Sequence, residues 1–245
     1  MALLLRTLRE SGKKKIQQKL FIIPFLFTFL NAFFGLLSVV NTLDENYLLA
    51  AYCILLAVFM DFCDGKLARA FGSCSGMGTQ LDSLCDAVSF CFAPAILLYG
   101  WRLHAAGSMV GFLAVAFYLC SGLFRLAKFN ILSMNQKSYF VGLPTTWAAF
   151  FIATMILAYP WIAHSFLCGM VSCAGLIAIL FLLSLLMLSS LHFFKSYTPK
   201  RAWIKIGMAL LGLVAAVFAP VGHLLLFVSA SAYILGNMVV DIYNR

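Results

Sequence analysis

Four aspartates lie within 26 positions of this sequence and make up half of its acidic residues. They are Asp61, Asp64, Asp82 and Asp86, in a chain of 245 residues with eight Asp and Glu. Both pairs fall inside or beside long apolar runs. An Asp at the centre of a bilayer costs about 2.5–3.5 kcal/mol on insertion scales. We therefore expect a membrane chain that carries four of them in one stretch to use their carboxylates.

The spacing within each pair predicts two carboxylates on one face of a helix. Asp61 and Asp64 would lie about 4.5 Å apart along a helix axis and about 60° around it, and Asp82 and Asp86 about 6 Å and about 40°. Antiparallel packing of the two helices would bring the pairs together. Close carboxylates repel one another unless cations neutralise them, and four negative charges match two divalent ions. Ligation by oxygen alone favours Mg²⁺, Ca²⁺ or Mn²⁺ over Zn²⁺.

The segment between the pairs is suited to binding phosphate. Gly65 and Ala68 lack bulk, so a ligand can approach the backbone closely. Lys66 and Arg69 are positive, and a guanidinium can hold a phosphate through two parallel hydrogen bonds. Carboxylates, metal ions and a guanidinium together predict a diphosphate site for phosphoryl-type transfer. The alternative is a polar hairpin in which the acids pair with Lys66 and Arg69.

The motif D-x2-D-G-x2-A-R-x8-G-x3-D-x3-D runs without a gap from Asp61 to Asp86. It resembles the signature of the CDP-alcohol phosphotransferases. The segments QLDSLCDAVSFCFAPA, FRLAKFN and FVGLPTTWAA resemble the phosphatidylserine synthase branch, and with Pro24, Thr28, Asn31 and Gly35 the resemblance covers roughly residues 20–150. Cys91 stands where that branch is expected to have glycine.

The resemblance implies transfer of the phosphatidyl group of CDP-diacylglycerol to L-serine, giving phosphatidylserine and CMP. It implies that Asp61, Asp64 and Asp82 hold two divalent ions, Mg²⁺ or Mn²⁺, and that Asp86 completes one metal site and accepts the proton of the serine hydroxyl. It also implies a homodimer. The residues expected to line the CDP pocket are Gly65, Ala68, Arg69, Ser75 and Gly78.

Two further groups of polar residues are candidates for substrate binding. Thr28 and Asn31 lie at i, i+3 in the first apolar run and would reach a nucleotide; the alternative is that they pack helices together. Arg125, Lys128 and Asn130 end the fourth apolar run. They would bind the carboxylate of the second substrate or a phosphate, or would simply be the basic flank of a membrane span.

Composition predicts an all-α, polytopic transmembrane bundle. Hydrophobic residues make up 64% of the chain and charged residues 10%, and the mean hydropathy is +1.01. The net charge of +9 does not indicate nucleic-acid binding, because the basic residues fall between apolar runs. Residues 1–19 are predicted to be a basic cytoplasmic arm and residues 20–245 one transmembrane catalytic domain. We expect about eight spans of ~20 residues, near 20–41, 46–63, 80–100, 107–127, 143–162, 167–191, 203–219 and 222–241.

Loop charges predict the orientation of such a bundle in the membrane. Sixteen of the 17 Lys and Arg fall on the side of the two termini, and only Arg102 falls on the other. The positive-inside rule then puts both termini and the four aspartates toward the cytoplasm. Two other functions stay open: transfer to glycerol 3-phosphate or inositol phosphate, and cation-coupled transport through intramembrane carboxylates.

Overall fold

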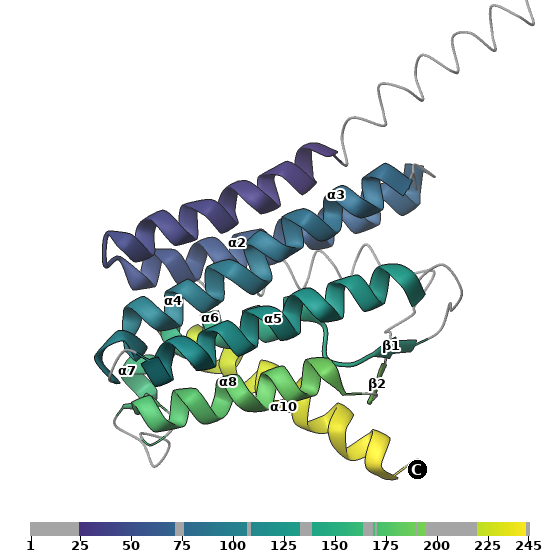
Figure 1. Ribbon diagram of the computed structural model, residues 1–245. Helices are drawn as coiled ribbons and strands as arrows, with labels where there is room; N and C mark the ends of the chain where they lie inside the picture. The colour runs from purple at the N-terminus through teal and green to yellow at the C-terminus, as the bar shows by residue number, and fades with distance from the viewer. Residues whose placement is uncertain are drawn as a thin grey trace, which may run out of the picture.

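The computed structural model describes residues 25–71, 76–106, 109–132, 139–163, 169, 171–189, 191–194 and 220–243. These residues form a bundle of helices that run side by side (Figure 1). The elements in chain order are a first helix Phe25–Leu43, α2 Tyr47–Phe71, α3 Gly76–Asp86, η1 Ala87–Phe92, α4 Ala93–Trp101, η2 Leu103–Ala106, α5 Met109–Leu132, β1 Tyr139–Val141, α6 Thr145–Leu157, α7 Tyr159–Ile162, α8 Cys173–Leu188, β2 His192–Phe194 and α10 Pro220–Tyr243.

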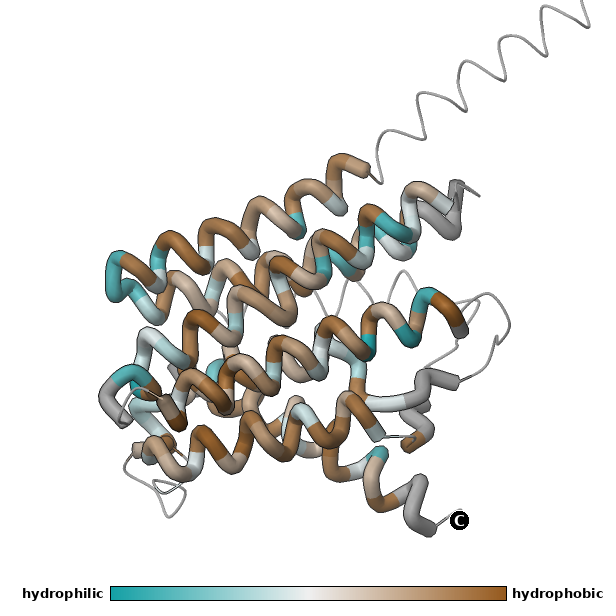
Figure 2. The backbone as a smooth tube through the Cα atoms, viewed as in Figure 1, coloured by the Kyte–Doolittle hydropathy of each residue, from teal (hydrophilic) through white to brown (hydrophobic). Residues whose placement is uncertain are grey.

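Five helical stretches are long and apolar enough to cross a membrane. They are Phe25–Leu43, Tyr47–Leu67, Gly76–Trp101, Met109–Ile131 and Gly222–Val239. Apolar residues dominate the length of these stretches in Figure 2. The shorter apolar helices α6 and α8 coincide with the predicted spans 143–162 and 167–191. The basic arm 1–19 and the predicted span 203–219 lie outside the described residues. The prediction of a helical bundle with several candidate membrane spans is confirmed.

The first helix has two unlike faces. Its buried face carries small or polar residues at alternating intervals of three and four: Thr28, Asn31, Gly35, Ser38 and Thr42. This face packs against the rod formed by α3, η1 and α4, since a Cβ on Gly35 or on Gly100 would clash with the opposing helix. The exposed face carries apolar side chains instead: Leu26, Phe29, Phe33, Leu36, Val40 and Leu43. Such a face suits lipid, whereas the buried face allows close helix packing.

The helix that carries Asp82 and Asp86 is continuous but irregular. α3 ends at Asp86, the π-helical segment η1 follows, and α4 continues the same rod to Trp101. A π segment inside an α-helix is rare and is often found at functional sites. Ser89, Phe90 and Cys91 in this segment are buried.

α6 forms the centre of the bundle. Ten of its thirteen residues are buried, including Ile152, Met155 and Ile156. It packs against α2 on one side and α10 on another, while α5 packs against α8. A helix that is apolar all round fits this central position.

A short antiparallel pairing joins the chain before α6 to the chain after α8. Phe140 in β1 lies opposite Phe193 in β2. Gly142 follows β1 with φ +80°, and a Cβ there would lie 2.5 Å from the Met187 carbonyl oxygen. Only glycine adopts this conformation at such close approach without strain. The pairing therefore fixes the entry to α6 against the end of α8.

Candidate active site

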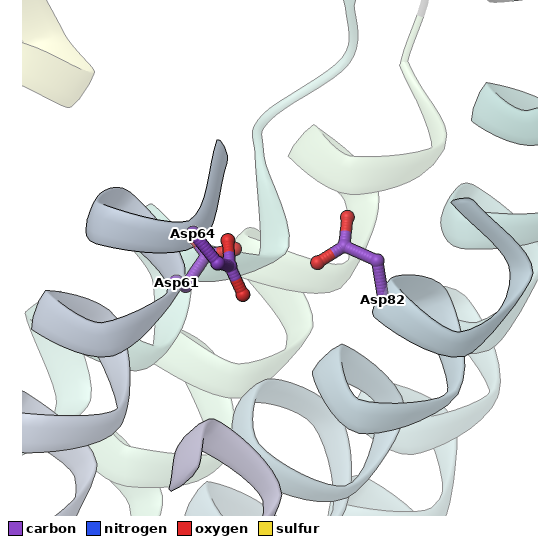
Figure 3. A group of neighbouring side chains, drawn as sticks. All are labelled: Asp61, Asp64 and Asp82. Atoms are coloured by element: carbon purple, nitrogen blue, oxygen red, sulfur yellow. The ribbon is translucent and has the colours of Figure 1, made fainter. Parts of the chain in front are cut away.

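Three of the four predicted aspartates meet between α2 and α3. Carboxylate oxygens of Asp61 and Asp64 on α2 and of Asp82 on α3 all lie within 4.8 Å of one another. Figure 3 shows the side chains from the two helices pointing toward a common point. Asp64 is buried, at 4% exposure, and the other two are half-buried. The predicted convergence of the two helices is confirmed for these residues.

The three carboxylates fit a divalent cation. Asp64 Oδ2 is buried, and no hydrogen-bond donor reaches it within the part of the chain that the structure describes. An unsatisfied buried carboxylate oxygen is costly unless a cation or a donor arrives. No cysteine or histidine belongs to this group among the described residues, so its ligands are oxygen alone. Oxygen ligands favour hard ions such as Mg²⁺ and Mn²⁺.

Asp86 lies beside these three residues but has a different partner. The Asn31 side chain donates a hydrogen bond from Nδ2 to Asp86 Oδ1 at 3.0 Å. Asp86 is close enough to Asp61 and Asp82 to interact with them electrostatically. It is not part of the group within 4.8 Å. The structure thus places the fourth aspartate at the edge of the cluster, held by the first helix.

The first helix supplies hydrogen-bond donors to the carboxylates. Thr28 lies within hydrogen-bonding reach of Asp64, and Asn31 bonds Asp86. Both residues are buried. Thr28 and Asn31 were predicted to reach a nucleotide or to pack helices together, and in the structure their side chains contact Asp64 and Asp86. Partners that orient metal ligands are a common feature of metal sites.

Arg125 brings a buried guanidinium to the same region from α5. It is 7% exposed, and its Nε has no hydrogen-bond partner among the described residues. Its Nη1 reaches Thr145 Oγ1 only at 3.5 Å, and its guanidinium lies over the Phe129 ring, 5.4 Å from the centroid. Arg125 interacts electrostatically with Asp86 and Asp61. A strong donor with unused capacity therefore faces the acidic cluster.

The other two predicted residues of α5, Lys128 and Asn130, follow Arg125 toward the end of the helix. Asn130 Oδ1 accepts a hydrogen bond from Ser83 Oγ at 2.9 Å, which ties the end of α5 to α3. Lys128 is half-buried. The structure brings Asn130 next to the helix that carries Asp82, and among the described residues Lys128 makes no direct contact with the four aspartates.

The predicted CDP-pocket residues lie where α2 ends and α3 begins. Gly65 and Gly78 are half-buried, on α2 and in the first turn of α3 respectively. Ala68 and Arg69 fall in the last turn of α2, which runs on to Phe71, but their side chains are outside the description. Ser75 lies outside the described residues.

Three residues near the site were missed by sequence reasoning. Ser89 Oγ donates to the Asn31 carbonyl at 2.8 Å, and Tyr118 Oη donates to the Phe90 carbonyl at 3.0 Å. Thr145 lies against Arg125. Ser89 and Thr145 fall within the segments that carry the family resemblance, which was the one available signal. Nothing in the sequence pattern singles out Tyr118.

Comparisons with known proteins find related sequences for most of the chain. The sequence model of the CDP-alcohol phosphatidyltransferase family matches residues 21–181. The CDP-diacylglycerol--serine O-phosphatidyltransferase of Mycobacterium leprae is 31% identical over 91% of this chain and 75% of its own length. The enzyme of the same name from Bacillus subtilis is 34% identical over 56% of this chain and 76% of its own. The archaetidylserine synthase of Methanothermobacter thermautotrophicus is 36% identical over 70% of this chain and 69% of its own length.

Proposed function

The chain belongs to the CDP-alcohol phosphatidyltransferase family, and we propose that it transfers the phosphatidyl group of CDP-diacylglycerol to the hydroxyl of L-serine, forming phosphatidylserine and CMP. The relative that spans 91% of the chain carries the name of this activity. The archaeal relative is named for a different lipid but for the same serine head group. Both names include serine, which favours L-serine as the acceptor over glycerol 3-phosphate or inositol phosphate.

The cluster of aspartates carries the proposed chemistry. Asp61, Asp64 and Asp82, whose oxygens already converge, would hold divalent metal, with Asp86 completing a second site. We expect two ions, Mg²⁺ or Mn²⁺, because four carboxylates match two divalent charges. Such ions, when bound, stabilise negative charge on the attacked phosphate and on the leaving group. The chain itself orients these carboxylates through Thr28 and Asn31.

Asp86 is the proposed proton acceptor. The serine hydroxyl oxygen attacks the phosphorus of the phosphatidyl group, and the bond from that phosphorus to the CMP oxygen breaks. CMP leaves with the bonding electrons, and the hydroxyl proton passes to Asp86. Asn31 holds one Asp86 oxygen, so the carboxylate has a fixed direction. A positioned base of this kind typically contributes about 10²–10⁴-fold to the rate.

Arg125 is the proposed anchor for the serine carboxylate. Its guanidinium is buried, has an Nε without a partner among the described residues, and lies near Asp86. Arginine is suited to bind carboxylate through two parallel hydrogen bonds. An acceptor held there has its hydroxyl beside the proposed base. Lys128 and Asn130 would extend this acceptor pocket at the end of α5.

The CDP group is assigned to the ends of α2 and α3. Gly65 and Gly78 leave room for close approach to the backbone, and Arg69 would bind the diphosphate. Ala68 and Ser75 complete this proposed pocket. Thr28 and Asn31 border it from the first helix.

We further propose the membrane arrangement of eight spans, with both termini and the aspartates facing the cytoplasm and with residues 1–19 as a basic arm outside the catalytic domain, 20–245. The charge asymmetry of the loops supports it. In a chain without other cysteines, single cysteines at Asn46 and Gln136 should react with an impermeant reagent from opposite sides. Reaction from one side would contradict the arrangement.

A homodimer, also proposed from the resemblance, is tested by measuring the mass of the protein in detergent.

The activity is tested with purified protein, radiolabelled CDP-diacylglycerol and a panel of alcohols. L-Serine should give phosphatidylserine and CMP in the presence of Mg²⁺ or Mn²⁺. Asp64→Asn is the matched negative control, because it removes a charge from the cluster with little change of shape. Equal or faster turnover with glycerol 3-phosphate or inositol phosphate would move the chain to another branch of the family. Absence of CMP release with every alcohol would contradict the proposed function itself.

A further inference from the structure

A π-helical segment begins directly after Asp86. α3 ends at this residue, and η1, Ala87–Phe92, follows before α4 continues the rod. A π turn bonds i to i+5 and so changes the helical register locally. The direction in which Asp86 leaves the helix therefore depends on how this segment is held.

The first helix holds one side of η1. Ser89 Oγ donates a hydrogen bond to the Asn31 carbonyl at 2.8 Å. The two helices also approach closely at this point, because a Cβ on Gly35 would lie 2.8 Å from Ser89 Cα. Asn31 and Ser89 are completely buried. The contact is therefore both tight and directional.

α5 holds the other side of the same segment. Tyr118 Oη donates to the Phe90 carbonyl at 3.0 Å, and both side chains are completely buried. One turn further along α5, a Cβ on Gly122 would lie 2.6 Å from Cys91 Sγ. The phenol thus bonds a backbone carbonyl inside η1, and the missing Cβ of Gly122 accommodates the thiol.

Asn31 links the contacts around η1 to Asp86. Its backbone carbonyl accepts from Ser89, and its side-chain Nδ2 donates to Asp86 Oδ1. Its own Oδ1 is buried without a partner among the described residues. A buried acceptor left unsatisfied costs about 1–3 kcal/mol. The Asn31 side chain is therefore expected to lower the stability of the fold at this position. Its amide is nevertheless well placed to orient Asp86.

We infer that Asn31 and Tyr118 are positioning residues that fix the direction of the Asp86 carboxylate, Asn31 through its hydrogen bond and Tyr118 by holding the π turn that follows. This inference rests on the proposed function for the role of Asp86. Neither residue is proposed to touch the reacting atoms. Groups that orient a ligand typically change metal affinity or activity by about 10–100-fold when they are removed.

The test compares Asn31→Ala and Tyr118→Phe with Ser184→Ala in the full-length protein in detergent. Ser184 is a matched control because its buried hydroxyl also donates to a backbone carbonyl, that of Leu180, within α8. We would measure the midpoint of thermal unfolding, kcat and KM for CMP release, and Mn²⁺ affinity by electron paramagnetic resonance. Asn31→Ala should lower kcat and Mn²⁺ affinity by about 10–100-fold. Tyr118→Phe should lower both in the same direction but less, and Ser184→Ala should change only the unfolding midpoint.

Two outcomes would overturn the inference. One is unchanged kcat and Mn²⁺ affinity in both variants at a loss of thermal stability like that of Ser184→Ala. The other is a rise in KM alone, which would mean that Asn31 and Tyr118 bind substrate. If Asn31→Ala does not fold, Tyr118→Phe decides, since it removes a single oxygen. Mn²⁺ affinity does not depend on turnover, so failure of the proposed function is distinguishable from failure of the positioning role.

Discussion

Replacing Arg125 by Gln should weaken binding of serine while leaving binding of CDP-diacylglycerol unchanged. Arg125 is 7% exposed, and its one hydrogen bond to another side chain in the described part of the chain is the 3.5 Å contact with Thr145. Its Nε–H, which has no partner among the described residues, is therefore available for a substrate. Glutamine keeps part of the length and polarity but loses the charge and the planar fork.

The expected rise in KM for serine follows from the strength of the hydrogen bonds that the guanidinium can donate. A hydrogen bond to a charged group contributes about 1.5–3 kcal/mol, and about 1.4 kcal/mol corresponds to a factor of ten. Loss of one such bond should raise KM for serine about 10–150-fold. Lysine keeps the charge but cannot form two parallel bonds, so Arg125→Lys should lie between wild type and Arg125→Gln.

The assay separates the carboxylate from every other effect of the substitution. Initial rates would be measured with L-serine and with serinol, which has the amine and hydroxyls but no carboxylate. Wild type should prefer serine strongly, and Arg125→Gln should lose that preference while turning over serinol about as before. Arg102→Gln is the control, since Arg102 follows the far end of α4 and stacks near Trp101 and Tyr159.

Equal losses with serine and serinol would refute the assignment, because the guanidinium would then act on something common to both acceptors. A rise in KM for CDP-diacylglycerol would instead assign Arg125 to the diphosphate. Both results can be read from the same set of initial rates.

Three further predictions concern two of the aspartates and the packing of α5 against η1. Asp86→Asn should lower kcat by about 10²–10⁴-fold and affect nucleotide affinity less; retention of more than about a tenth of the rate would exclude Asp86 as the base. Asp61→Asn should weaken both Mn²⁺ binding and CDP-diacylglycerol binding, measured by titration, and unchanged affinities would remove it from the metal site. Gly122→Ala should destabilise the fold, because the new Cβ would lie 2.6 Å from Cys91 Sγ. Cys91→Gly in the same chain should restore part of the unfolding midpoint, and no recovery would show that another neighbour is responsible.

The aspartate cluster was predictable because it depends on local geometry. Intervals of three and four residues put Asp61 with Asp64, and Asp82 with Asp86, on single helix faces. A short connection made the two helices antiparallel neighbours. These two facts predict that the carboxylates meet, and in the structure oxygens of Asp61, Asp64 and Asp82 lie within 4.8 Å of one another.

The partners of the cluster could not be predicted in the same way. Asn31 lies 55 positions from its partner Asp86 in sequence, and Thr28 lies on the same helix, far from Asp64. Helical periodicity gives the face of Thr28 and Asn31 but not the helix that this face contacts. The π segment after Asp86 is equally hidden, since five of the six residues of Ala87–Phe92 are apolar. Periodicity in an apolar stretch of a membrane protein gives no signal for one altered turn. The identity of Tyr118 as its partner depends on packing between α5 and η1.

Charge links the four acids of the site to Arg125, the one buried basic side chain within the part of the chain that the structure describes. Asp61, Asp64, Asp82 and Asp86 carry four formal negative charges, and Arg125 offsets one of them. The substrate diphosphate brings two more negative charges, which this set of residues would repel. With one divalent ion the site is still negative, whereas with two it becomes slightly positive and attracts the diphosphate. Electrostatics in a low-dielectric interior make this difference large. On this charge count, the proposed site with two divalent ions would attract the diphosphate, whereas the same site with one ion would repel it.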